Sequence, residues 1–318
     1  MAVVDLASES SLAQYVAEHA QTDYQRYLAA HDSGFSHARA ATIAGPGELF
    51  GRLDGARSAA VKLVPEPWDT RWVGHSTAHL IPLAGTDRVT QAEAVREALD
   101  EAREQGIELL TSRLAYDAFD WIHTLERAGW SLVDAMAIFL WDRTAPRPAT
   151  PVRHPELRIS PFHPRDNPAA LPKIRALGRL AFAYSRWRND PRVPAAAVDA
   201  CADALIDTLL ARPDAVCLVG WNGRDPVSMA VGAPDEEISR HLAQPLGYLW
   251  TIAVDPAHAG QGLGREMLEA FFEAASPSMR FVEIGTQLNN HAAVTLYGRA
   301  GLPVVSSLVT LHNWLRES

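Results

Sequence analysis

The sequence predicts an α/β (α+β) protein of two similar halves, each a mixed, mostly antiparallel sheet flanked by helices. Strand-like and helix-like segments alternate along the chain, which favours sheets covered by helices. A helix ending at Ala-Gly and followed by a strand that finishes in Trp occurs at residues 127–141 and again at 299–314. This self-similarity indicates an internal duplication of one half-chain.

A proline-rich stretch without apolar periodicity marks the boundary between the halves. It covers residues 143–156 and is typical of a linker. We therefore expect one domain at residues 1–142 and a second at 157–318. A chain of 318 residues is long enough to form two hydrophobic cores.

In the N-terminal half, apolar spacing predicts a helix-rich segment at residues 1–40. Prolines and tryptophans at 65–74 indicate a rigid aromatic loop. A helix at 91–105 has Thr90 as its expected N-cap and Gly106 just past its end. The other expected elements are strands at 59–64, 76–83, 107–114 and 131–141 and a helix at 116–128.

In the C-terminal half, two apolar runs at residues 215–221 and 226–232 predict a hairpin about Asn222-Gly223. The stretch at 184–191 is predicted to be a loop. The remaining expected elements are strands at 157–159, 247–254 and 280–287 and helices at 167–182 and 194–210.

A glycine-spaced turn joins the strand at 247–254 to an amphipathic helix. Gly260, Gly262 and Gly264 recur at every second position. Backbone N–H groups that open a helix are unpaired and can converge on an anion. The spacing is neither that of a Walker loop nor that of the dinucleotide fingerprint. The turn predicts a phosphate-binding site, although three glycines alone also suit a connection without a ligand.

Two signatures resemble those of the GNAT acetyltransferase superfamily. Residues 254–264 are similar to its acetyl-CoA pyrophosphate loop, V-x-P-x-x-(R/Q)-G-x-G-(I/L)-(G/A), except that Ala259 replaces the usual Arg or Gln. Residues 290–302 are similar to its second signature, N-x-x-A-x-x-L-Y-x-(K/R)-x-G-(F/L). The resemblance implies an acetyl-CoA-dependent N-acetyltransferase with a splayed central parallel strand pair in the C-terminal domain.

The resemblance also assigns the cofactor contacts. Main-chain groups of the strand would pair with the arm of the cofactor, and amides of the turn would hold its pyrophosphate. Asn290 suits the N-cap of the next helix and would also contact the arm. The expected cofactor-binding residues are Ile252, Ala253, Val254, Gln261, Gly262, Leu263, Gly264, Arg265 and Asn290.

Tyr297, in the second signature, is the expected general acid for the leaving thiolate. Its ordinary pKa of about 10 keeps it protonated at neutral pH. A half-buried helix aromatic is the alternative. Glu283 could relay a proton from the amine through water if the strand register points it at the site. An amine with a pKa of about 8 needs no dedicated base.

A second resemblance concerns the acceptor. Trp68-Asp69-Thr70 is similar to the W-D-S/T motif of TDP-fucosamine acetyltransferases, which acetylate a nucleotide-linked 4-amino-4,6-dideoxyhexose, and residues 183–188 and 285–290 are similar to the same family. This implies an amino sugar, free or nucleotide-linked, as the small-molecule amine. The expected substrate-side residues are Tyr184, Arg186, Trp187 and Trp250. A surface loop with one buried aromatic is the alternative at 184–187.

The N-terminal half is expected to be a degenerate GNAT-like domain without cofactor. Its counterpart of the glycine turn, at residues 85–94, contains Gly85 alone. Leu125 occupies the position that Tyr297 has in the C-terminal copy.

Composition narrows the class of protein. A net charge of −9 argues against nucleic acid as the main partner. No apolar run suits a membrane span and no leader is recognised, so we expect a cytoplasmic protein. Two cysteines exclude a disulfide framework, and no metal site is predicted.

Other functions remain open at this stage. The acceptor could be an aminoglycoside, the cysteinyl amine of a mycothiol precursor or a protein N-terminus. A non-catalytic acyl-CoA sensor is a further alternative. The sequence leaves the oligomeric state open, with a homodimer among the options.

Overall fold

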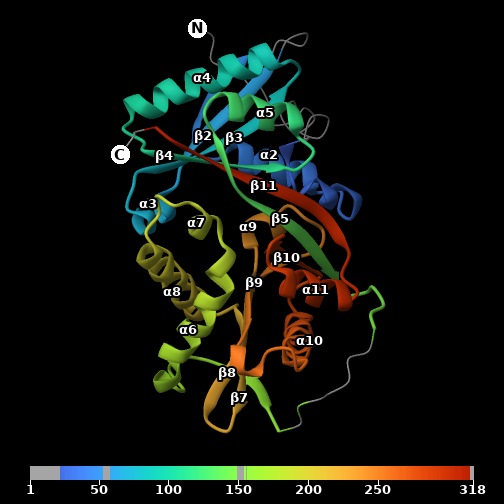
Figure 1. Cartoon of the computed structure of the whole chain (residues 1–318). Coiled ribbons are helices and arrows are strands. Elements are labelled where there is room, and N and C mark those ends of the chain that lie inside the picture. Colours follow the sequence, from blue (N-terminus) through green and yellow to red (C-terminus); the bar gives the residue numbers. More distant parts are fainter. Residues whose placement is uncertain (1–21, 53–57, 149–153, 155, 316–318) are drawn as a thin grey trace. The chain divides into compact units, whose positions relative to one another are not determined.

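The computed structural model describes residues 22–52, 58–148, 154 and 156–315. Contacts divide the chain into two compact units (Figure 1), which are Met1–Met136 with Ser306–Ser318, and Ala137–Val305. We call them the first and second unit. Most of the helix expected at residues 1–40 lies outside the described residues, and its described part contains η2 (Arg26–Ala30) and α2 (Phe35–Ala44).

The first unit is built on a five-stranded arrangement with the order β1-β2-β3-β4-β11. Helices α4 and α5 pack on it over an apolar core that includes Val61, Val95 and Leu125. The elements are β1 (Glu48–Arg52), β2 (Ala59–Pro65), α3 (Pro67–Val73), β3 (Thr77–Gly85), α4 (Arg88–Glu104), β4 (Leu109–Ala115), α5 (Phe119–Arg127) and β11 (Val304–Trp314). The strand β5 (Ser131–Asp142) begins in this unit.

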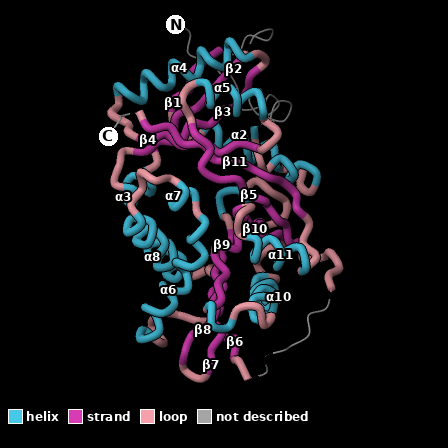
Figure 2. Tube along the Cα trace, viewed as in Figure 1, coloured by secondary structure: helices cyan, strands magenta, loops and turns pink. Residues whose placement is uncertain are grey.

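The second unit has the strand order β5-β10-β9-β8-β7-β6. One apolar cluster packs α10 and α11 against the sheet, and another packs α6 and α8 against it (Figures 1 and 2). The strands are β6 (Arg158–Pro161), β7 (Val216–Asn222), β8 (Asp225–Pro234), β9 (Leu246–Val254) and β10 (Phe281–Gln287). The helices are η3 (Pro168–Ala170), α6 (Leu171–Ala181), η4 (Phe182–Tyr184), α7 (Arg186–Asn189), α8 (Ala195–Ala211), α9 (Glu236–Ser239), η5 (Pro256–His258), α10 (Leu263–Ala275) and α11 (His291–Arg299).

In each unit, a parallel strand pair separates after three residues. In the first unit, β3 and β4 pair from Thr77↔Leu109 to His79↔Thr111. In the second unit, β9 and β10 pair from Phe281↔Leu246 to Glu283↔Tyr248. The splayed pair expected in the C-terminal domain is confirmed, and the same geometry in the first unit agrees with a duplicated half-chain.

The C-terminal strand belongs to the first unit. β11 pairs antiparallel with β4, from Leu308↔Ala115 to Trp314↔Leu109. Residues 137–142 of β5, in turn, belong to the second unit, where β5 neighbours β10. The compact units therefore differ from the predicted halves, 1–142 and 157–318. A strand belongs to the unit that contains its hydrogen-bonded partner, which need not be close to it in sequence.

Three local predictions need correction. The aromatic loop expected at 65–74 contains helix α3, which has Pro67 in its first turn and ends at Gly74 with a left-handed φ of 83°. The N-cap of α4 is Asp87 rather than Thr90. The loop expected at 184–191 contains α7. The hairpin about Asn222-Gly223 is confirmed, with Asn222 paired to Asp225.

Asp87 caps α4 with its own carboxylate, which accepts hydrogen bonds from the N–H groups of Val89 and Thr90, each at 3.0 Å. We expect Asp87→Ala to lower the free energy of unfolding by about 1 kcal/mol, the usual effect of removing an N-cap side chain. Urea unfolding followed by circular dichroism measures this. Asp100→Ala, at an exposed position of the same helix, should change stability less, and equal losses would contradict the capping role.

Among the described residues, no helix combines the length and the apolar character that a membrane span requires.

Candidate functional site

A cavity of about 650 Å³ opens in the second unit next to the splayed strands. Beyond Tyr248, residues of β9 have no partner in β10, although both strands are described in full. The cavity is lined by the end of β9, the glycine turn and the first turns of α10 and α11, with the end of α6 and η4 adding to its wall. The splay therefore leaves main-chain groups of β9 on the edge of a cavity.

A β-bulge shapes β9 just after it leaves β10. Val231 of β8 pairs with Thr251 and the next residue, Gly232, pairs with Leu249, so Trp250 is an extra residue in the ladder. The Trp250 side chain is 48% exposed. Bulges redirect side chains and loosen pairing at the point where a site is built.

The glycine turn opens α10 without a side-chain cap. Gly260 and Gly262 have left-handed φ values of 74° and 102°, which only glycine adopts at little cost. Gly262 is the N-cap of α10, and among the described residues it provides no side-chain cap for the first amides of the helix. In the first unit, α4 follows its splayed strand in the same way, but there the carboxylate of Asp87 accepts those amide hydrogens.

The turn is held from both sides by charged groups. The ammonium of Lys173 on α6 donates to the Asp255 carboxylate at 2.9 Å, which lowers the pKa of Asp255. The His154 Nε2 lies 2.9 Å from the carbonyl oxygen of Gln261, and this contact raises the pKa of His154. The His154 contact is made to the backbone of the turn itself, and the Lys173 contact holds the Asp255 side chain that precedes it.

Basic side chains border the same end of the cavity. Arg265, Arg299 and His258 contribute to its lining. The Arg265 guanidinium donates to the carbonyl oxygen of Arg299 at 2.7 Å and pairs with Glu269 at 3.0 Å. Helix amides and guanidinium groups are the donors that a diphosphate requires, so this end of the cavity fits a diphosphate.

Most of the predicted cofactor residues come together here. Gln261 is exposed and Leu263 is buried in the core, and neither borders the cavity. The side chain of Asn290 caps α11, as expected, by accepting from the Ala293 N–H at 3.2 Å. The predicted residues that line the cavity are Ile252, Ala253, Val254, Gly262, Gly264, Arg265 and Asn290.

Tyr297 points into the core of the second unit rather than lining the cavity. It is 4% exposed, and its ring packs edge-on against Phe139 at 5.2 Å. Burial raises the pKa of Tyr297 above its usual value, so the hydroxyl keeps its proton. Its neighbour Leu296 does line the cavity. Glu283 is also buried, at the last paired position of β10.

The predicted substrate-side residues divide between two places. Tyr184 lines the same cavity as the cofactor residues. The Arg186 guanidinium lies over the Trp187 ring at 4.4 Å, and Trp187 is buried. Trp250 lines a separate cavity with Tyr248. The structure therefore brings only Tyr184 of this group beside the glycine turn.

Sequence reasoning missed the contribution of α6. Leu180 and Ala181 line the cavity from the end of this helix. The helix itself was predicted, but which of its residues face a ligand depends on how α6 docks on the sheet.

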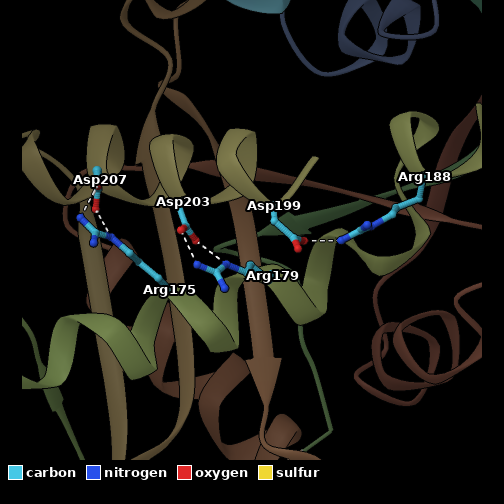
Figure 3. A network of polar contacts seen from close by, with 6 residues as sticks. All are labelled: Arg175, Arg179, Arg188, Asp199, Asp203 and Asp207. Atoms are coloured by element: carbon cyan, nitrogen blue, oxygen red, sulfur yellow. Dashed lines mark hydrogen bonds and ion pairs between the residues drawn. The ribbon is translucent and has the colours of Figure 1, made fainter. Parts of the chain in front are cut away.

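A ladder of ion pairs fastens α6 and α7 to α8 (Figure 3). The aspartates repeat every four residues on α8 and so share one face. The guanidinium of Arg175 meets Asp207 through two hydrogen bonds of 2.9 and 2.7 Å. The rungs of the ladder are Arg175–Asp207, Arg179–Asp203 and Arg188–Asp199.

The ladder should add modestly to stability. A double-mutant cycle with Arg179→Gln and Asp203→Asn is expected to give a coupling free energy of about 0.2–1 kcal/mol, which should shrink in high salt. The matched control is Arg103–Asp100, whose side chains are 53% and 62% exposed. The Arg179 guanidinium makes two hydrogen bonds to the Asp203 carboxylate. Equal coupling free energies in the two pairs would show that this double hydrogen bond adds no stability.

The fold and part of the sequence have known relatives. Residues 182–302 match the family model described as Acetyltransferase (GNAT) family. A GCN5-related N-acetyltransferase from Sphaerobacter thermophilus is 13% identical with a TM-score of 0.62, and the match covers 98% of this chain and 95% of that one. A tandem GNAT protein from the clavulanic acid biosynthesis pathway is 16% identical with a TM-score of 0.55, and the match covers 100% and 98%. No curated protein sequence matches the chain.

Proposed function

We propose that this chain, which has a tandem GNAT acetyltransferase fold with its family match at residues 182–302, is an acetyl-CoA-dependent N-acetyltransferase. The observation that carries the proposal is the splayed pair of β9 and β10, which opens onto a cavity ending at the uncapped amides of α10. A strand edge for an extended arm and a helix N-terminus for a diphosphate suit the two parts of CoA.

Acetyl-CoA would supply an activated acetyl group as a thioester. Main-chain groups of Ile252 to Val254 would bind its arm, and the amides of residues 262–264 would bind its diphosphate, with Arg265 and Arg299 adding positive charge. The net reaction forms an N–C bond, breaks the C–S bond and transfers one proton from the amine nitrogen to the sulfur.

Tyr297 is proposed as the group that donates a proton to the departing sulfur. Its raised pKa favours the protonated hydroxyl at the pH of the reaction, and the role requires this buried hydroxyl to come within hydrogen-bond reach of the sulfur in the complex. Glu283 is proposed to accept the proton of the amine, through water, because it lies where β9 and β10 part. Acid–base help of this kind typically accelerates a reaction by about 10²- to 10⁴-fold.

The acceptor is proposed to be the primary amine of a small molecule, with an amino sugar as the first class to test. Of the substrate-side residues, Tyr184 is the one that lines the cavity beside the glycine turn, which favours its role in binding the acceptor. The first unit is proposed to bind no cofactor, because Asp87 already accepts the amide hydrogens that a diphosphate would need.

One observation favours a second candidate, a non-catalytic acyl-CoA-binding protein. Tyr297 is buried against Phe139 and does not line the cavity, as expected if its ring serves packing alone. Such a protein would bind acetyl-CoA and release no thiol with any amine.

Two measurements on the full chain test the proposal. Calorimetry with acetyl-CoA should show one site per chain, and an assay of free thiol should detect release when an amino sugar is added. Absence of acetyl-CoA binding would overturn the proposal. Binding without thiol release across aminoglycosides, cysteinyl amines, peptides and amino sugars would favour the binding-protein alternative.

A further inference from the structure

A second cavity, of about 550 Å³, lies at the opposite end of β9 from the glycine turn. We call it the acidic aromatic pocket. It is formed where β8 ends, β9 begins and α9 starts. Its lining includes Arg212, Asp214, Asp235, Glu236, Glu237, Tyr248 and Trp250.

Two aromatic rings form one wall of this pocket. Tyr248 and Trp250 lie on the same strand with ring centroids 5.3 Å apart and planes at 57°. Trp250 is a bulged residue and is 48% exposed. The exposed face of such an indole attracts a cation, an interaction of about 0.5–2 kcal/mol.

Carboxylates outnumber basic groups in the pocket. Asp214 is engaged by the guanidinium of Arg212 at 2.9 and 2.6 Å, and Asp235 caps α9 by accepting from the Ile238 N–H at 2.9 Å. Glu236 and Glu237 are exposed; neither forms an ion pair with a described residue, and Arg212 interacts with Glu236 only through space. The pocket therefore keeps two glutamates beside two aromatic rings.

The pocket is connected to the proposed reaction site through β9. Trp250 lies two residues before Ile252, which lines the cofactor cavity. The bulge thus places the exposed Trp250 ring in the same strand that borders the cofactor cavity, two residues before Ile252.

We propose that the acidic aromatic pocket binds the non-reacting part of the acceptor, and that the acceptor is a small molecule with two or more positively charged nitrogen groups. This inference rests on the proposed acetyl transfer. The attacking nitrogen must be neutral when it reacts, so the glutamates and the indole face cannot be serving that nitrogen. A second nitrogen of the acceptor that stays protonated would bind both the glutamates and the indole face.

The proposal separates two kinds of amino sugar. A diamino sugar or a diamine carries the second positive charge that the pocket needs. A nucleotide-linked amino sugar carries a diphosphate, which Glu236 and Glu237 would repel. The pocket therefore favours a cationic acceptor over a nucleotide-linked one.

The test compares matched probes on the full chain by calorimetry at low salt. The probes are 1,4-diaminobutane, 1-aminobutane, which lacks the second charge, and a UDP-linked amino sugar. The diamine is expected to bind at least about 10-fold more tightly than the monoamine, a difference of about 1.4 kcal/mol. This preference should weaken as salt is raised.

Variants locate the binding. Glu236→Gln with Glu237→Gln should abolish the preference for the diamine, and Trp250→Leu should reduce it. Glu273→Gln is the matched control, because Glu273 is exposed in the same unit and lines neither cavity. In thiol-release assays with a diamine, the double variant should raise KM for the amine and leave KM for acetyl-CoA unchanged.

The outcomes distinguish the two proposals. Acetyl-CoA binding together with equal affinity for diamine and monoamine, or tighter binding of the UDP-linked sugar, overturns the cationic-acceptor inference and leaves acetyl transfer in place. A diamine preference that survives the double variant also overturns it. Diamine binding at the pocket without acetyl-CoA binding overturns acetyl transfer instead.

Discussion

Replacing Tyr297 by Phe is expected to lower the rate of acetyl transfer by about 10²- to 10⁴-fold, because it removes the hydroxyl proposed as general acid. The ring would remain, and so would its edge-on contact with Phe139 at 5.2 Å. Affinity for acetyl-CoA and the free energy of unfolding should therefore change little. Thiol-release kinetics and calorimetry on the same preparation separate the two effects.

Tyr184→Phe is the matched control, since Tyr184 also carries a phenol and lines the cofactor cavity. Its turnover should stay much closer to that of the unchanged protein. If Tyr184→Phe is instead the variant that loses turnover, the acid is Tyr184. If neither variant loses turnover, neither of these two phenols is the acid.

The pH profile gives an independent check of the acid. A general acid works only while protonated, and burial raises the pKa of Tyr297. Loss of activity through its deprotonation is therefore expected only above pH 10, the ordinary tyrosine value. A Tyr297-dependent decline that begins near pH 8 would contradict this assignment.

Replacing Gly262 by Ala is expected to weaken acetyl-CoA binding by about 10-fold or more. The φ of Gly262 is 102°, and a side chain in left-handed conformation costs about 1–2 kcal/mol. The turn would relax and its amides would move away from the diphosphate. Because 1.4 kcal/mol corresponds to a factor of ten, calorimetry can measure the loss.

Gly264→Ala is the control for this substitution. Gly264 does not have a positive φ, and an added Cβ would lie 3.6 Å from Leu296 and Val254, an ordinary contact. Its affinity for acetyl-CoA should stay near that of the unchanged protein. An equal loss in both variants would mean that filling the turn, rather than the left-handed backbone, weakens binding.

The parts of the site predicted correctly are those set by a few neighbouring residues. Spaced glycines predicted the turn, and two of them adopt left-handed φ. Asn290 was predicted to cap α11 and does so. Each of these features follows from the local conformational preference of one residue type, so a short stretch of sequence contains all the information needed.

The features that only the tertiary structure decided depend on pairing between distant segments. β11 joins the first unit because it pairs with β4, about 200 positions earlier in the chain. The exposure of Trp250 follows from a bulge in the pairing of β8 with β9, and the burial of Tyr297 follows from its packing against Phe139. Strand register and side-chain packing are long-range properties, and no local pattern in the sequence encodes them.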